Sequence, residues 1–257
     1  MKKIILLLSL TIIATTSCSK SDDTVPVATT GNLAKRIVYF NVLSNGTIET
    51  ETIDLSYNGN KLNKITYADG GKEVYTYTGN NITKTETFGT DGLLDETKTF
   101  TYVNNVLIYS LIAEVGSPSN YKTDYVLNTD GTITETQSSI DNQTGTVTVN
   151  SSYEKTYTNG NLVRSELLGV PSFTIVESYE YDTKNNPLKN ILGFDKIEFI
   201  GSNNQTKETA VTTVTFNGGS TTTDIRTTQY VYNANGYPTE EKRYQNNVLD
   251  ETVVYTY

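Results

Sequence analysis

Few residues of this chain could carry out chemistry. The 257-residue sequence contains no histidine, no tryptophan and one cysteine, Cys18. These absences exclude Ser-His-Asp and Cys-His nucleophile systems and the usual zinc and copper ligand sets, so we expect no metal and no cofactor. Carboxylates remain. Close pairs of them occur at Glu49/Glu51, Glu240/Glu241 and Asp250/Glu251.

Paired carboxylates are the catalytic groups of glycoside hydrolases, which hold two of them about 5–9.5 Å apart in a cleft. Here the pairs lie on alternating segments or beside turns, where solvated charge discourages sheets from joining edge to edge. We therefore predict that the protein is not an enzyme, with a carboxylate-dependent glycan hydrolase as an alternative. Asp91-Gly92 and Asp130-Gly131 could offer oxygens to calcium, but their spacing is typical of turns.

The elements that would position these groups are β-hairpins. Their mark is a repeated pattern of an aromatic residue, a spacer, two turn residues, a spacer and an apolar residue. Asn-Gly and related pairs favour a type I′ turn, in which both central residues adopt positive φ. The aromatic and apolar residues should then face each other across two strands. The pairs are Tyr57 and Leu62, Tyr77 and Ile82, Tyr102 and Leu107, Tyr157 and Leu162, and Tyr244 and Leu249, with a weaker copy from Phe216 to Thr221.

The tyrosines recur about every 20–30 residues, and Tyr181 and Tyr232 extend the series, which is the spacing of a repeat with two strands and two turns. We predict one all-β domain at residues 33–257, an antiparallel meander of about sixteen to twenty strands. The sheet should curl so that a Tyr/Leu/Ile face is enclosed and a Thr/Lys/Glu face is wet. Residues 106–115 could be helix or strand, and their valine and isoleucine content favours strand.

The first 17 residues predict an export signal, because Lys2 and Lys3 precede an apolar run too short to span a bilayer. The run ends in small residues directly before Cys18, which resembles a bacterial lipoprotein signal, where the cysteine becomes the acylated first residue. Several acyl chains hold a protein stably at a membrane. The alternative is an ordinary cleaved signal with an incidental cysteine.

Residues 18–32 are small and polar, so they predict a flexible tether. Acidic residues soon after Cys18 resemble the signal that sends Bacteroidetes lipoproteins to the outer face of the outer membrane. Asp23-Thr24-Val25 resembles the O-glycosylation sequon of that phylum, which makes Thr24 a candidate site. We therefore expect a lipid-anchored, surface-exposed outer-membrane protein.

The charge excludes one class of partner. Removal of residues 1–17 leaves 18 basic residues against 29 acidic ones, a net charge of −11. Because an acidic surface repels phosphate backbones, we expect no binding to nucleic acid.

Two segments resemble the Tyr-x-Tyr-Asp-x-x-Gly-x-Leu/Pro unit of YD (RHS-type) repeats. They are residues 179–188, where Asn185 replaces the glycine, and residues 230–238, where Asn233 replaces the aspartate. The mature chain as a whole resembles Bacteroidetes lipoproteins of unknown function with degenerate repeats of this kind. The resemblance implies a sheet of β-hairpin repeats rather than a closed shell, and it brings no activity.

The leading hypothesis for function is a non-catalytic binding or structural module on the cell envelope, with a glycan or an envelope protein as partner. Tyrosine rings bind sugars through an apolar face and a hydroxyl, although regular Tyr/Leu pairs are also what the repeat needs to fold. The alternatives are a glycan hydrolase and an accessory protein of a secretion or adhesion system. An open groove lined by tyrosines would favour glycan binding, and two facing carboxylates in a pocket would favour hydrolysis.

Overall fold

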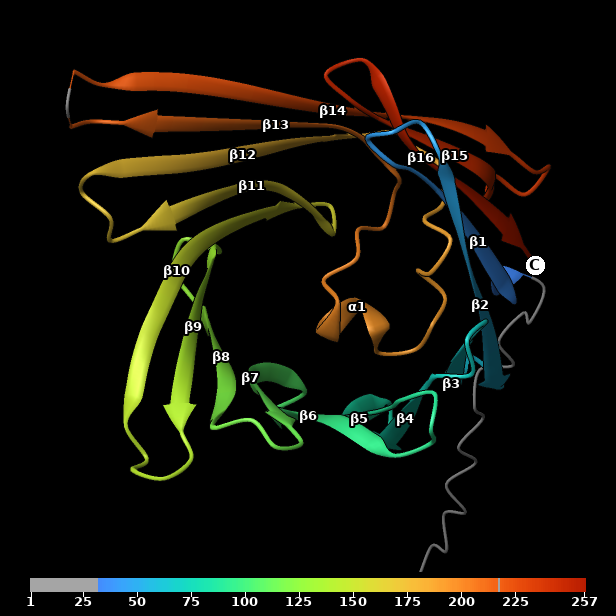
Figure 1. Cartoon of the computed structure of the whole chain (residues 1–257), viewed down its shortest axis with the longest axis horizontal. Coiled ribbons are helices and arrows are strands. Elements are labelled where there is room, and N and C mark those ends of the chain that lie inside the picture. Colours follow the sequence, from blue (N-terminus) through green and yellow to red (C-terminus); the bar gives the residue numbers. More distant parts are fainter. Residues whose placement is uncertain (1–31, 217) are drawn as a thin grey trace, which may run out of the picture.

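The computed structural model describes residues 32–216 and 218–257 and shows sixteen antiparallel strands in a closed barrel (Figure 1). Each strand pairs with its neighbours in sequence, and β1 (Arg36–Val42) closes the barrel against β16 (Val248–Thr256). The prediction of an all-β antiparallel meander is confirmed. The expected curled sheet is more specifically a closed barrel, which leaves no unpaired edge.

The other strands are β2 (Ile48–Asn58), β3 (Lys61–Tyr67), β4 (Lys72–Thr78), β5 (Asn81–Phe88), β6 (Leu94–Val103), β7 (Val106–Glu114), β8 (Ser119–Leu127), β9 (Ile133–Asp141), β10 (Val147–Thr158), β11 (Asn161–Leu168), β12 (Phe173–Tyr181), β13 (Gln205–Val214), β14 (Ser220–Tyr232) and β15 (Pro238–Gln245). Residues 106–114 therefore form a strand, as their β-branched content favours. Helix α1 (Phe194–Ile197) lies between β12 and β13.

The repeated turns are of two kinds. Both central residues have positive φ at Asn104-Asn105 (50° and 67°), Asn159-Gly160 (52° and 78°) and Asn246-Asn247 (49° and 69°), as type I′ requires. At Gly59-Asn60 and Gly79-Asn80 only the glycine has positive φ (64° and 59°), which is the type II′ pattern. The expectation of type I′ is wrong for these two turns, where glycine comes first.

Both turn types place the aromatic residue opposite the apolar one. The observed partners are Tyr57 and Leu62, Tyr77 and Ile82, Tyr102 and Leu107, Tyr157 and Leu162, and Tyr244 and Leu249. Three positions of the series differ from the sequence pattern. Phe216 lies in a turn while Thr221 pairs with Thr213, and Tyr181 and Tyr232 precede longer connections.

Tyrosine hydroxyls tie several hairpins to the one before, although the buried hydroxyl of Tyr157 has no partner among the described residues. The Leu62 N–H donates to the Tyr77 hydroxyl at 3.0 Å, and the Tyr102 hydroxyl donates to the Ile82 carbonyl at 2.8 Å. The Tyr181 hydroxyl donates to the Leu162 carbonyl at 2.7 Å. This bond explains the spacing of about 20 residues, because one period separates a tyrosine from the backbone atom that it reaches.

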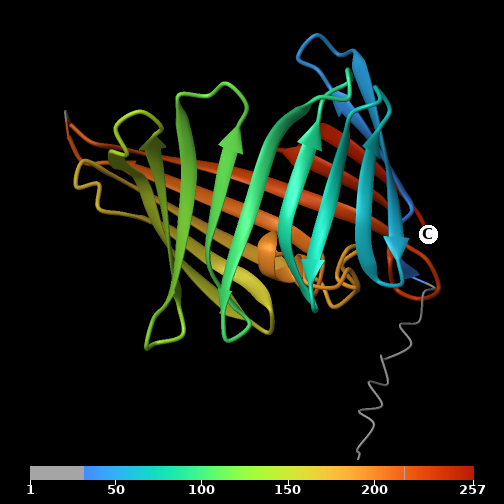
Figure 2. The ribbon, with the colours of Figure 1, turned by 90° about the horizontal axis from the view of Figure 1, so that it is seen from below.

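Residues 182–204, here called the plug, leave β12 and fold into the barrel, as Figures 1 and 2 show. Its side chains Ile191, Phe194 and Ile197 are at most 7% exposed and join the core formed by the inward residues of the wall, among them Leu62 and Ile82. The plug therefore fills part of the lumen.

The turns between even- and odd-numbered strands hold the plug. The Leu192 N–H donates to the Asn60 carbonyl at 2.9 Å, and Lys196 Nζ donates to Asn81 Oδ1 at 2.7 Å. Gly193 approaches the same ring of turns, with a φ of 74°. This end of the barrel, which also receives β1 and releases β16, is called the plug end, and the opposite one the far end.

The outer face carries charged pairs, but the expected division into an enclosed Tyr/Leu/Ile face and a wet Thr/Lys/Glu face holds only in part, because Thr85 and Glu241 are buried and Val126 and Val231 are exposed. Its ion pairs flank residues that are buried on the inner face, such as Ile37, Thr85, Ser165 and Glu241. The pairs are Arg36–Asp54, Lys84–Glu86, Lys122–Asp124, Arg164–Glu166, Lys207–Glu180 and Lys242–Glu240. Within residues 32–216 and 218–257, no helix has the length and apolar content needed to cross a membrane.

Candidate functional site

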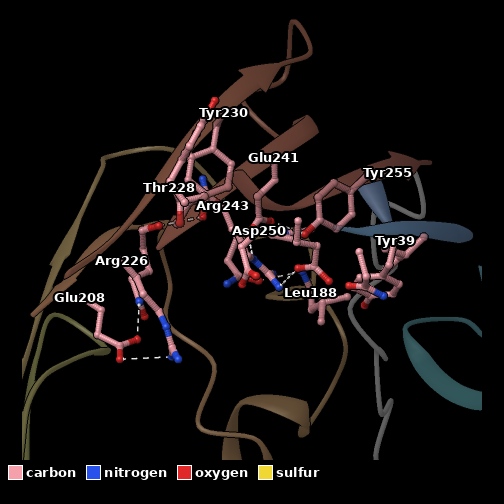
Figure 3. Close-up of a pocket in the computed structure, with 18 of the residues that line it drawn as sticks. Tyr39, Leu188, Glu208, Arg226, Thr228, Tyr230, Glu241, Arg243, Asp250 and Tyr255 are labelled. Carbon is pink, nitrogen blue, oxygen red and sulfur yellow. Dashed lines mark hydrogen bonds and ion pairs between the residues drawn. The ribbon is translucent and has the colours of Figure 1, made fainter. Parts of the chain in front are cut away.

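A cavity of about 760 Å³ lies inside the barrel, between the plug and the wall formed by β1 and β13–β16 (Figure 3). We call it the lumen cavity. Leu188, Ile200 and Asn204 of the plug form one side, and Val42 and Leu43 place its other margin near the far end. The volume falls within the range of small-molecule sites, roughly 300–1,000 Å³.

A cluster of charged side chains occupies the wall of the lumen cavity. Arg243 on β15 lies opposite Glu251 on β16, and Glu241 stands two residues earlier on the same face of β15. Arg243 Nε donates to Glu241 Oε1 at 2.5 Å, and Arg243 also donates to Glu251. The Tyr255 hydroxyl donates to Glu241 Oε2 at 2.6 Å, so one guanidinium and one phenol satisfy a carboxylate that is 5% exposed.

Burial and neighbouring charges both shift the pKa values of Glu251 and Arg243. Burial raises the pKa of Glu251 above its usual value, and the guanidinium of Arg243 only partly opposes the shift. Burial lowers the pKa of Arg243, but the carboxylates of Glu241 and Glu251 outweigh it and leave that pKa raised. Burial also raises the pKa of Tyr39 to about 12. The arginine is therefore charged and the phenol is protonated at neutral pH.

The plug side of the lumen cavity is rich in amides. The Tyr230 hydroxyl donates to the Gln205 carbonyl at 2.8 Å. Asn204, which is 2% exposed, donates from Nδ2 to Asp182 Oδ2 at 3.2 Å. Its Oδ1 accepts no hydrogen bond from any described residue. A buried acceptor without a donor is costly, and such groups often mark a place where water or a ligand binds.

The three carboxylate pairs of the sequence have different fates. Glu240 faces outward and pairs with Lys242 at 3.1 Å, whereas Glu241 is buried in the lumen, so the expectation that this pair is solvated is wrong for Glu241. Glu49 and Glu51 are exposed and lie opposite Asn41 and Tyr39. Asp250 and Glu251 both line the lumen cavity.

The residues that meet in the site are therefore mostly not those that the sequence singled out. Glu241 and Glu251, from different predicted pairs, converge on Arg243. Of the repeat tyrosines, Tyr244 lines the lumen cavity, while Tyr57, Tyr77, Tyr102, Tyr157, Tyr181 and Tyr232 do not. The tyrosines that do line it, besides Tyr244, are Tyr39, Tyr230 and Tyr255. The only signal in the sequence that could have identified these tyrosines was their position on the inward face of a strand.

The remaining site predictions concern covalent modification and metal binding. Cys18 and Thr24 lie outside the described residues. In the described part of the chain, no three Asp or Glu side chains gather closely enough to hold a metal ion.

No protein-family model matches the sequence, and no curated protein matches it. Solved structures of similar fold include a porin-like protein from Bacteroides uniformis ATCC 8492, with 14% identity, a TM-score of 0.48, and coverage of 87% of this chain and 97% of that one. Another is a porin-like protein from Bacteroides vulgatus ATCC 8482, with 10% identity, a TM-score of 0.44, and coverage of 88% and 98%. Similarity at this level decides neither the location nor the activity of this chain.

Proposed function

We propose that the protein is a lipid-anchored envelope protein whose barrel stands outside the bilayer and binds a glycan in the lumen cavity. The observation that supports binding is the cavity itself, closed by the plug on one side and lined by four tyrosines and several amides. Tyrosine rings stack on the apolar faces of sugars, and amides and carboxylates bind their hydroxyls.

The outer face argues that the barrel does not sit in lipid. Membrane-spanning barrels carry an apolar band about 25 Å tall on the outside, and a Lys or Arg at the bilayer midplane costs roughly 2–4 kcal/mol. Here Lys84–Glu86 and Arg164–Glu166 lie in mid-strand, so charged pairs interrupt the exposed apolar side chains, such as Val126 and Val231, on the outside of the strands. An acyl anchor on Cys18 provides a membrane attachment that does not require insertion of the barrel.

The path of the chain sets the orientation in this proposal. Leu33 and Ala34 are buried at the plug end, directly before β1. An anchor at Cys18 would therefore hold the plug end toward the membrane and leave the far end, where Leu43 borders the cavity, facing away. Ligands would then enter the cavity from the side that faces away from the anchoring membrane.

A non-catalytic role fits the geometry better than hydrolysis. Glu241 and Glu251 both accept hydrogen bonds from Arg243, so a guanidinium stands where a glycosidase would place the scissile bond. Hydrolysis is therefore the alternative function, and the assay described below tests for it.

The test combines location with binding. Cells grown with labelled palmitate should incorporate the label into the wild-type protein and not into Cys18→Ser, and protease added to intact cells should cleave the barrel if it is surface-exposed. Purified protein is then titrated with oligosaccharides of different composition, and the sugars are checked for cleavage. Glu241→Gln should weaken binding, while the outward-facing control Glu240→Gln should not. The proposal is contradicted if the wild-type protein incorporates no labelled palmitate and binds no oligosaccharide.

A further inference from the structure

The charges that line the lumen cavity do not cancel. Four carboxylates and two guanidinium groups face it. Both cations are already used, because Arg226 pairs with Glu208 at 3.6 Å and Arg243 binds Glu241 and Glu251. Asp250, which is exposed at the cavity wall, forms no ion pair with a described residue. The cavity therefore keeps a negative charge with no free cation to offer to an acidic ligand.

Hydrogen-bonding capacity is unbalanced in the same direction. The hydroxyls of Tyr255 and Tyr230 already donate to Glu241 and to the Gln205 carbonyl. The acceptor Oδ1 of Asn204 has no donor, although Asn204 is 2% exposed and lines the cavity. The carboxylates of this wall can only accept hydrogen bonds, so they favour ligand groups that donate.

Elsewhere on the inner face, Glu96 on β6 lies opposite Glu114 on β7, and Lys98 on the same face of β6 partly offsets their charge. In the lumen cavity the excess of carboxylates concentrates a negative potential, which attracts cations.

We propose that the lumen cavity selects oligosaccharides that carry protonated amino groups over neutral or acidic ones, an inference that rests on the proposed glycan-binding function. An ammonium group offers three donors and no acceptor, so it fits the exposed carboxylate of Asp250, which is unpaired within the described residues. The sugar rings stack on tyrosines such as Tyr39, and the cation gains from the ring faces. A uronic acid would instead meet Asp250 and Glu251 with a like charge.

The test is a calorimetric titration of the detergent-solubilised full-length protein with four probes: a glucosamine tetramer, its N-acetylated form, a galacturonic acid tetramer and a lysine tetramer. We expect the glucosamine tetramer to bind about two- to fivefold more tightly than the N-acetylated form, as one exposed ion pair allows. The preference should shrink as salt is raised. Asp250→Asn should reduce this preference severalfold.

The control is Glu240→Gln, which removes a carboxylate from the outer face and should change nothing. Equal binding of the amino and N-acetylated forms overturns the selectivity and leaves glycan binding in place. Tightest binding of the uronic acid tetramer overturns it in the same way. Tightest binding of the lysine tetramer overturns the choice of a sugar, and absence of binding by all three sugars overturns the proposed function itself.

Discussion

Replacing Arg243 by methionine should destabilise the barrel by removing the charge that compensates a buried carboxylate. Glu241 is 5% exposed and its two oxygens bind only Arg243 Nε and the Tyr255 hydroxyl. Methionine keeps the length and apolar stem of arginine and loses the guanidinium. The carboxylate of Glu241 would then remain in the lumen with one neutral donor.

The expected loss can be bounded from burial. Breaking a fully buried pair by removing one partner costs roughly 3–5 kcal/mol. The Arg243 side chain is 45% exposed, so water can partly replace it, and we expect about 2–4 kcal/mol. For a chain of this length that loss lowers the melting temperature by roughly 5–15 °C. Because protonation relieves an uncompensated carboxylate, the deficit should narrow as the pH is lowered.

Urea and thermal unfolding followed by circular dichroism measure the effect. The matched control is Arg164→Met, which breaks a half-exposed outer pair with Glu166 and should cost less than about 1 kcal/mol. The double variant Arg243→Met with Glu241→Gln should recover at least half of the loss, since glutamine still accepts from Tyr255. If Arg243→Met costs no more than Arg164→Met, the buried-cluster reasoning is refuted.

Three further predictions test the core, the plug and the inner charges. Leu62→Ala, at a fully buried position, should lower the free energy of unfolding in urea by roughly 2–5 kcal/mol, and a loss below 1 kcal/mol would contradict its place in the core. Gly193→Ala adds a Cβ 2.8 Å from the Asn80 carbonyl at a φ of 74°, so plug amides should exchange hydrogen faster, at a cost of about 1–3 kcal/mol. Burial raises the pKa of Glu96, Lys98 partly opposes this shift, and the nearby carboxylate of Glu114 adds to it. The ionised carboxylate of Glu96 therefore destabilises the fold as the pH rises above about 4.3, the ordinary pKa of glutamate. Glu96→Gln should gain roughly 0.2–1 kcal/mol at pH 7 and nothing at pH 3.5, as measured by urea unfolding at each pH.

The sheet was predictable because its signals are local. Two-residue turns with Gly or Asn and the alternation along strands such as β5 fix where the chain reverses and which residues share a face. Closure was not predictable, because the pairing of Arg36 with Thr256 joins residues at opposite ends of the domain. No local pattern distinguishes a curled sheet from a closed barrel.

The site was harder to predict for a related reason. Neighbouring charges such as Glu240 and Glu241 look alike in the sequence, yet the period of two sends one to solvent and the other into the lumen. The plug lacks periodicity and resembles an ordinary connection. One signal was available, since a stretch of more than 20 residues without strands is unusual in a compact domain, and this one contains apolar residues at Ile191, Phe194 and Ile197.

The repeat and the plug depend on each other. The turns at residues 59–60, 79–80 and 104–105 place a tyrosine and a leucine or isoleucine in the lumen, and because side chains alternate, neighbouring residues such as Lys84 and Glu86 face outward. A sixteen-stranded barrel with that polarity would leave residues such as Leu62 and Ile82 lining an empty, wet interior. The plug removes this cost by covering them with Phe194 and its neighbours, and it fills only part of the lumen. The space that remains beside β13–β16, where the wall becomes charged rather than apolar, is the part of the interior that the fold has no need to fill.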